Sequence, residues 1–245
     1  DAVERLVRTD RDWIPDRAGH ALYIRPVVFS AEPHLEVRPS TRYRFVVMTC
    51  PAGAYFNPGG EGLSLKVEDT YARTAPHGGV GEAKTSANYA TTFLAGSRAR
   101  EEGFDQVLWL DGGEHRYVEE AGLMNVFFKI GDRVVTPALN GAILPGVTRD
   151  SIITLLGDNG VTVEERPVDI HEIVGAFDDG VIQEVFVTGT AAVVLPVGRL
   201  SFEGRDLRPA EYGAGPTTRR LYDELTGIQY GRIEDSRGWI RIVEV

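Results

Sequence analysis

The chain has little cysteine and no long apolar stretch, and each shortage excludes a class of protein. Cys50 is the only cysteine among the 245 residues, so neither an intrachain disulfide framework nor a multi-cysteine zinc or iron–sulfur site can form. No apolar run approaches ~18 residues, so no membrane span is expected, and the first residues do not resemble a signal peptide. We therefore expect a soluble protein of a reducing compartment, the cytoplasm.

Positive charge is also scarce. The 26 basic and 36 acidic residues give a net charge of −10 without any basic run, which argues against a nucleic-acid partner. Only three of the basic residues are lysines (Lys66, Lys84 and Lys129), so a lysine that is present can be there for its amine chemistry. The histidines show no metal-ligand spacing, and no metal is expected.

What remains is the composition of a globular protein, with 42% hydrophobic and 25% charged residues. Proline and glycine gather at residues 57–64 and separate a short first portion from the rest. We therefore predict a first portion over residues 1–57, a linker over 58–64 and a large domain over 65–245.

Hydrophobic periodicity and turn residues predict a mixture of strands and helices. Strands are expected over residues 21–29, 43–49, 106–110, 125–130, 133–136, 184–188, 193–197 and 239–243. Helices are expected over residues 2–8, 89–102, 148–158, 170–177 and 217–225. The predicted fold class is α/β, or α+β with mixed strands.

The glycine-rich segment 78–85, Gly-Gly-Val-Gly-Glu-Ala-Lys-Thr, is the most conspicuous motif. It misses the phosphate-binding loop of nucleoside triphosphatases by one residue, because Ala83 stands where the second glycine belongs, and no hydrophobic strand directly precedes it. Lys84, followed five residues later by Tyr89, suits instead a Schiff-base amine with a phenol beside it. Such an amine has to be held off solvent.

Three further segments suit an anionic aromatic cofactor. Glu119 and Glu120 stand just before the strand at 125–130, where a buried carboxylate would keep a pyridine nitrogen protonated. Residues 144–148 and 188–191 present backbone N–H groups and hydroxyls, the first of them at a helix N-terminus, and both suit an anion.

Taken in chain order, these and neighbouring strings form a resemblance that covers nearly the whole sequence. They are Leu-Tyr-Ile-Arg-Pro (22–26), Lys84 with Asn-Tyr (88–89), Gln-Val-Leu-Trp-Leu (106–110), Val-Glu-Glu (118–120), Met-Asn (124–125), Leu-Pro-Gly-Val-Thr-Arg-Asp (144–150), Gly-Thr-Ala (189–191) and Leu-Thr-Gly-Ile-Gln-Tyr-Gly (225–231). The chain resembles the branched-chain amino acid aminotransferases, which are pyridoxal-phosphate enzymes of fold type IV. That resemblance implies an incomplete N-terminal α/β domain followed by a C-terminal mixed-sheet pseudo-barrel domain.

The resemblance also implies a role for each matched residue. Lys84 would form the Schiff base with pyridoxal 5'-phosphate and carry the proton between substrate and cofactor. Glu120 would pair with the pyridine nitrogen and Tyr89 with the phenolate oxygen, whereas Glu119 is expected to be a solvated neighbour because consecutive strand residues face opposite ways. The phosphate would be held by Gly146, Val147, Thr148 and Thr190. The substrate would be bound by Tyr23, Arg25, Tyr55, Leu123, Thr190 and Ala191.

The implied activity is transamination between L-leucine, L-isoleucine or L-valine and 2-oxoglutarate, by a ping-pong mechanism through pyridoxamine phosphate, in a homodimer. The sequence departs from the family at Ser86-Ala87, where Gly-Gly is usual, and at Leu123, which would narrow the substrate pocket. Ala192 and Leu195 replace a Cys-x-x-Cys redox motif, and nothing corresponds to the family's further N-terminal segment. Two other functions stay open: a fold-type IV module that binds a ligand or partner without catalysis, and nucleotide binding at the glycine loop.

Overall fold

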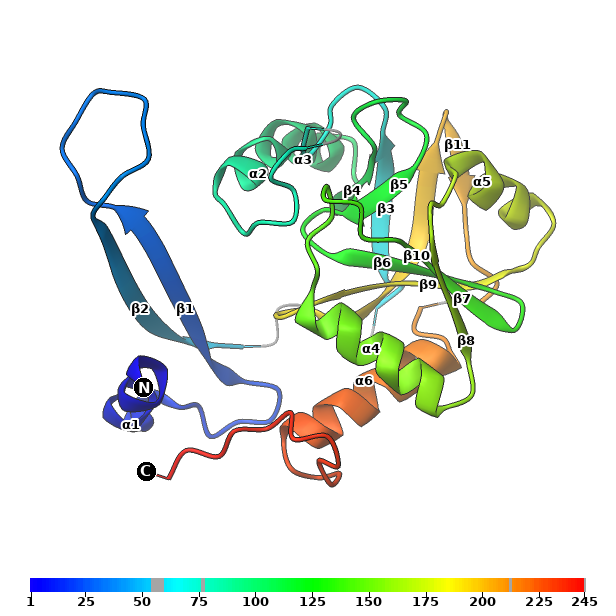
Figure 1. The fold of residues 1–245 in the computed structure, drawn as a ribbon. Coiled ribbons are helices and arrows are strands. Elements are labelled where there is room, and N and C mark those ends of the chain that lie inside the picture. Colours follow the sequence, from blue (N-terminus) through cyan, green and yellow to red (C-terminus); the bar gives the residue numbers. More distant parts are fainter. Residues whose placement is uncertain (54–59, 76–77, 212, 245) are drawn as a thin grey trace. The chain divides into compact units, whose positions relative to one another are not determined.

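The computed structural model describes residues 1–53, 60–75, 78–211 and 213–244. The chain forms two compact units, one made of Asp1–Tyr55 with Asp235–Val245 and the other of Phe56–Glu234 (Figure 1). The predicted division into residues 1–57, 58–64 and 65–245 stays a prediction.

The first unit is built on a two-stranded antiparallel ribbon. Strand β1 (Ala21–Ser30) pairs with β2 (Tyr43–Ala52) in continuous register, as the β-branched and aromatic residues of both segments favour. Helix α1 (Ala2–Thr9) is capped by the Asp1 carboxylate, which accepts hydrogen bonds from the first-turn N–H groups, and the one-turn helix η1 (Arg11–Trp13) follows it. The helix and both strands predicted in this region are confirmed.

The C-terminal residues of this unit do not form the strand predicted over 239–243, and that prediction is wrong. Within the described part of the chain, residues 235–244 carry no strand or helix. The Asp235 carboxylate accepts a hydrogen bond from Ile240 N at 2.7 Å, which turns the backbone away from an extended ladder. The tail is instead joined to α1 by ion pairing of Arg241 with Glu4 at 2.9 Å.

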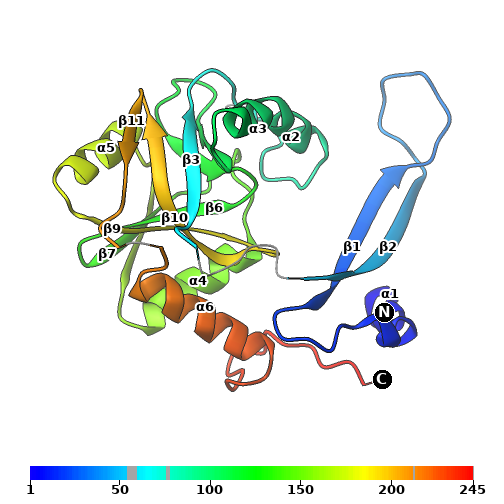
Figure 2. The ribbon, with the colours of Figure 1, turned by 180° about the vertical axis from the view of Figure 1, so that it is seen from behind.

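The second unit is a nine-stranded mixed sheet within the described residues, in the order β5-β4-β3-β10-β9-β6-β7-β8, with β11 paired to β10. The strands are β3 (Leu63–Glu68), β4 (Gln106–Leu110), β5 (Val118–Ala121), β6 (Asn125–Ile130), β7 (Arg133–Pro137), β8 (Thr162–Arg166), β9 (Ile182–Gly189), β10 (Val193–Phe202) and β11 (Arg205–Leu207). Three pairs are parallel (β10 with β3, β3 with β4, and β7 with β8) and the others are antiparallel. The sheet curls, so that β3 runs across the direction of β6 and β9 (Figures 1 and 2).

Helices cover this sheet on separate faces. The helices are α2 (Ala87–Ala90), α3 (Thr92–Glu101), α4 (Val147–Asp158), α5 (Ile170–Asp178) and α6 (Pro216–Gln229). The apolar sides of α4 and α6 pack with the stacked rings of Phe127 and Phe186, whose centroids are 5.0 Å apart. Helix α5 packs on the other core, which β3, β4, β5, β6, β9 and β10 build, and α3 packs against Trp109 of β4.

Most predicted elements of this unit are confirmed, and the differences are one divided helix and several strands that were not predicted. The strand at 106–110, the hairpin of β6 and β7, and the helices now labelled α4, α5 and α6 are all present. The helix predicted over 89–102 is two helices, α2 and α3, and β3 begins at Leu63, inside the predicted linker. Strands β3, β8 and β11 were not predicted, and β5 was implied only by the alternation expected of Glu119 and Glu120, because at least half of the residues in each strand are polar or charged and no apolar run marks it. None of the helices among the described residues has the length and apolarity that a membrane crossing requires.

Candidate active site

Lys84 and Tyr89 lie together at the start of α2. The Lys84 ammonium donates a hydrogen bond to the Tyr89 hydroxyl at 2.9 Å. Asn88 fixes the loop that carries the lysine, because its side-chain amide donates to the carbonyls of Val80 (2.7 Å) and Ala83 (2.9 Å). Lys84 itself is exposed, so the described residues do not hold its amine off solvent.

The loop does not have the setting of a nucleotide-binding loop. Such a loop joins a strand directly to a helix, whose N-terminus binds the phosphates. Here β3 ends at Glu68, ten residues before Gly78, and the helix that follows Lys84 is the four-residue α2. The geometry therefore favours the amine chemistry of Lys84 over nucleotide binding.

Glu120 is a buried carboxylate on β5, as the sequence predicts. Its Oε2 lies 2.6 Å from Nε of Arg73, which is also buried, and its Oε1 accepts a long hydrogen bond (3.3 Å) from the Asn125 amide. Burial raises the pKa of Glu120 to about 7, while the positive charges of Arg73 and Lys84 act to lower this pKa. The charge of Lys84 therefore reaches Glu120, as expected of two groups that share one site.

Glu119 is not solvated, and the expectation that it would be is wrong. Only 2% of this residue is exposed, the same fraction as for Glu120. The alternation of the strand is present, but both faces of β5 are covered, so each of its four residues is buried. Burial raises the pKa of Glu119 to about 7, with the charge of Arg73 opposing the shift and those of Asp111 and Glu120 adding to it.

The N-terminus of α4 is the first of the two predicted anion loops. Gly146 is its N-cap residue, and among the described residues no side chain caps the N–H groups of the first turn, where Val147 is 84% exposed and Thr148 half-buried. The Asn125 amide donates to the Leu144 carbonyl at 3.0 Å. A Cβ added to Gly146 would overlap Oδ1 of Asn125, so only a glycine allows the loop backbone to pack this closely against Asn125. Uncapped N–H groups at the positive end of a helix bind anions.

The second anion loop follows β9 and lies near the first. Asn125 at the start of β6 is the direct cross-strand partner of Thr188 near the end of β9, and its side chain contacts Leu144 of the first loop, so both loops lie at the same end of β6 and β9. Thr190 and Ala191 are exposed in the turn to β10. The next strand opens on Val193 with φ at 56°, a left-handed conformation that costs energy for a β-branched residue.

The remaining predicted residues are not brought to this constellation by described contacts. Arg25 and Tyr23 belong to the first unit, where the Arg25 guanidinium donates to the Tyr23 hydroxyl at 2.7 Å. Leu123 is 52% exposed in the turn after β5. Tyr55 lies outside the described residues.

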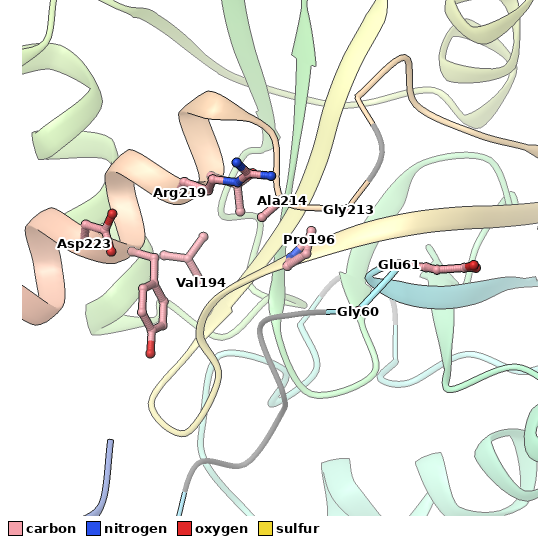
Figure 3. A pocket seen from close by; sticks show the side chains of 10 residues that line it. Gly60, Glu61, Val194, Pro196, Gly213, Ala214, Arg219 and Asp223 are labelled. Carbon is pink, nitrogen blue, oxygen red and sulfur yellow. The ribbon is translucent and has the colours of Figure 1, made fainter. Parts of the chain in front are cut away.

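The second unit also has an open pocket of about 600 Å³, away from the predicted residues. Figure 3 shows the side chains of Val194 and Pro196 on β10, and of Arg219 and Asp223 on α6, around it. The predicted site residues that the structure describes do not line this pocket. The candidate site is therefore the constellation around Lys84, Glu120 and the N-terminus of α4.

Arg73, Asn88 and Asn125 are the residues of this constellation to which sequence reasoning gave no role. Arg73 contacts residues 8, 47 and 69 positions away in the chain, so no local pattern marks it. Asn125 stands in a Met-Asn pair that was noted only as a string. Its signal is positional, since an asparagine opens a strand whose next three residues are apolar.

The groups present fit pyridoxal 5'-phosphate. An amine with a phenol beside it suits an aromatic aldehyde, a buried carboxylate suits a pyridine nitrogen, and an uncapped helix N-terminus suits a phosphate. Among the described residues, no three His, Cys, Asp or Glu side chains are grouped so that they could hold a metal ion.

Comparison with known proteins agrees with this donor set. The family profile described as amino-transferase class IV matches residues 4–200. The structure of the Escherichia coli branched-chain amino acid aminotransferase superposes with a TM-score of 0.81 and 28% identity, covering 99% of this chain and 75% of that one. That of the Thermobaculum terrenum enzyme, solved in its PLP form, gives 0.80 and 26%, covering 100% and 74%. The fold and the site thus define a class IV aminotransferase.

Curated relatives narrow the class. The chain is 50% identical over 242 residues to a probable branched-chain-amino-acid aminotransferase of Staphylococcus epidermidis, covering 98% of this chain and 67% of the relative. It is 46% identical over 245 residues to the branched-chain-amino-acid aminotransferase of Mycobacterium tuberculosis, covering 98% and 66%. The chain belongs to the branched-chain-amino-acid aminotransferases and spans about two thirds of the length of these relatives.

Proposed function

We propose that this chain catalyses pyridoxal-phosphate-dependent transamination between branched-chain L-amino acids (leucine, isoleucine and valine) and 2-oxoglutarate, in two ping-pong half-reactions. The observation that carries the proposal is the hydrogen bond between Lys84 and Tyr89 in the same compact unit as the buried Glu120 and the uncapped N-terminus of α4. The relatives at 46–50% identity, which carry this activity in their names, support the choice of substrate.

Bound pyridoxal 5'-phosphate supplies an aldehyde that condenses with amines and a ring that accepts electrons from the substrate Cα. Lys84 holds the aldehyde and then moves a proton to and from the substrate Cα. Tyr89 keeps the lysine aligned and donates a hydrogen bond to the ring hydroxyl oxygen. Glu120, as a carboxylate, holds a proton on the ring nitrogen, which preserves the electron-accepting character of the ring. Gly146, Val147, Thr148 and Thr190 hold the phosphate.

The substrate needs local cations and amides, because a net charge of −10 repels anionic cofactor and substrate alike. We assign carboxylate binding to Arg25 with Tyr23, whose guanidinium and hydroxyl are already hydrogen bonded at 2.7 Å, and to the backbone of Thr190 and Ala191. Leu123 and Tyr55 are assigned to the pocket wall around the substrate side chain. A homodimer and a cytoplasmic location belong to the same proposal.

An amino-donor panel tests this function. Protein loaded with pyridoxal 5'-phosphate is given each amino acid with 2-oxoglutarate, and L-glutamate is measured. We expect glutamate from L-leucine, L-isoleucine and L-valine, and little from L-aspartate, basic or D-amino acids. Protein that binds the cofactor but yields no glutamate from any donor would contradict the proposal and favour a non-catalytic binding module.

A further inference from the structure

Arg73 is a buried arginine to which the mechanism above gives no role. Only 4% of this residue is exposed. Its Nε lies 2.6 Å from Oε2 of Glu120, and the two side chains are only 4% and 3% exposed. Its Nη2 donates hydrogen bonds to the backbone carbonyls of Gly81 (3.3 Å) and Ala142. One guanidinium therefore joins a buried carboxylate to two separate loops.

Both loops carry residues of the proposed site. Gly81 lies three residues before Lys84, and Ala142 lies four residues before Gly146 at the N-terminus of α4. The loops pack directly on each other, since a Cβ added to Gly81 would overlap the Ala142 backbone, and Glu82 N donates to the Gly141 carbonyl at 3.0 Å. Arg73 thus lies where the amine-bearing loop, the phosphate-binding loop and the Glu120 carboxylate meet.

The charges around Arg73 explain why a cation is needed there. Glu119 and Glu120 are both buried, and Arg73 is the strongest opposing charge for each of them. A buried carboxylate without a cation takes up a proton, and a protonated Glu120 would not hold a proton on the cofactor ring. The forked guanidinium also reaches carbonyls and carboxylate at once, which an ammonium does not.

We propose that Arg73 is a positioning residue for the cofactor: it orients the Glu120 carboxylate and ties it to the loops of Lys84 and Gly146. It acts through these groups and touches neither substrate nor reacting atoms. This inference rests on the proposed function, because it assumes that Glu120 faces a pyridine nitrogen.

A double-mutant cycle on cofactor affinity tests the proposal. The dissociation constant of pyridoxal 5'-phosphate is measured by absorbance for the wild type, Arg73→Met, Glu120→Gln and the double variant. We expect each single change to raise the constant about tenfold or more, and the double variant to bind no more than about threefold more weakly than the weaker single variant, because both changes remove the same interaction. Single effects that multiply in the double variant would overturn the proposal.

Two further variants separate positioning from general stability. Arg73→Lys keeps the cation without the fork, and we expect it to bind the cofactor with an affinity between those of the wild type and Arg73→Met. Arg166→Met removes an arginine paired with Glu164 and Glu172, outside the site, and should leave cofactor affinity unchanged. Equal loss of affinity in Arg166→Met and Arg73→Met would overturn the inference. A wild type that binds no pyridoxal 5'-phosphate would instead refute the proposed function on which it rests.

Discussion

Glu119 and Glu120 are neighbouring carboxylates on β5, a strand of only four residues. The Arg73 guanidinium contacts Glu120, and its charge also opposes the pKa shift of Glu119. An ion buried without a full partner destabilises the fold, because its desolvation exceeds the attraction it gains. The proposed function explains why Glu120 is buried, because a carboxylate shielded from water interacts more strongly with a protonated ring nitrogen. Glu119 has no such task, and one of its oxygens has no hydrogen-bond partner among the described residues.

Glu119 therefore makes the stability of the fold depend on pH. Its pKa is 4.5 in an ordinary setting and about 7 in the fold, so the folded state binds more protons between these values and becomes less stable as pH rises from 4.5 to 7. We predict that Glu119→Gln raises the free energy of unfolding by about 1–3 kcal/mol at about pH 8 and has little effect at pH 4.5 or below. Urea unfolding at the two pH values measures this.

The matched control is Glu101→Gln, which changes an exposed carboxylate on α3. It should leave the pH dependence of unfolding as in the wild type. If Glu119→Gln also left the pH dependence of unfolding unchanged, ionisation of the buried Glu119 carboxylate would not be what destabilises the fold as pH rises.

At the residue scale, sequence predicts what is local. Lys84 and Tyr89 are five positions apart, a spacing that a single turn closes, and their contact agrees with the prediction. The burial of Glu119 depends on what covers both faces of β5, and Arg73 finds its partners through three distant segments. Neither depends on a pattern within a short window of sequence.

Two helix N-termini in the second unit differ in whether a side chain caps their N–H groups. That of α6 is closed by Glu184 on β9, whose carboxylate accepts from Thr217 N (2.9 Å), Thr218 N (2.8 Å) and the Thr218 hydroxyl (2.7 Å), with Lys129 Nζ at 3.6 Å. That of α4 has no side-chain cap from any residue that the structure describes. The N-terminal N–H groups of α6 are therefore hydrogen bonded within the protein, whereas those of α4 are available to bind an anion.

Removing the carboxylate that seals α6 should destabilise the fold. We predict that Glu184→Ala lowers the free energy of unfolding by about 2 kcal/mol or more, because two backbone N–H groups lose their partner in a buried place. Burial raises the pKa of Glu184, but the hydrogen bonds from Thr218 and Thr217 outweigh it and leave this pKa below its usual value. The stabilisation is therefore present above pH 4.5 and lost as pH falls below it.

Glu102→Ala is the comparison for this prediction. It breaks the exposed ion pair of Glu102 with Lys66, which contributes within about 0.5 kcal/mol. Thermal and denaturant unfolding of both variants measure the difference, and equal losses would contradict the capping role of Glu184.

The N-terminus of α4 gives a prediction about the cofactor. Gly146→Ala should weaken binding of pyridoxal 5'-phosphate about tenfold or more, because the added methyl group displaces the loop from Asn125. Gly157→Ala, near the other end of the same helix, adds a methyl group in open space. It should leave affinity unchanged and raise stability by up to about 1 kcal/mol. Equal affinities for the two variants would remove this loop from the binding site.

Elements were predictable where consecutive or periodic apolar residues dominated the segment. The alternating and apolar segments of β6, β7 and β9, and the amphipathic helices α5 and α6, carry their own signals. Strand β3 lies between β10 and β4 as their parallel partner, so its existence is decided by strands as far as 134 residues away, as the pairing of Leu63 with Val197 shows. Tertiary pairing of this kind overrides a local reading of Gly-rich sequence.

At the scale of the whole molecule, the proposed catalytic constellation belongs to the second unit and the proposed substrate-binding residues Tyr23 and Arg25 to the first. The chain spans about two thirds of the length of its curated relatives. Because the net charge is negative, anions have to be attracted by individual cations near the site. Arg25, Arg73 and Lys84 are the cations to which we assign a role. Of these, Lys84 decides whether the protein does chemistry at all.

The most direct test of that claim is the visible absorbance of protein titrated with pyridoxal 5'-phosphate and then given L-leucine. The wild type should develop a visible band that L-leucine discharges, and so should Lys66→Ala, which removes an exposed lysine paired with Glu102. Lys84→Ala should show neither the band nor turnover, because it lacks the amine that holds the cofactor. Transamination of L-leucine by Lys84→Ala at the wild-type rate would contradict the account.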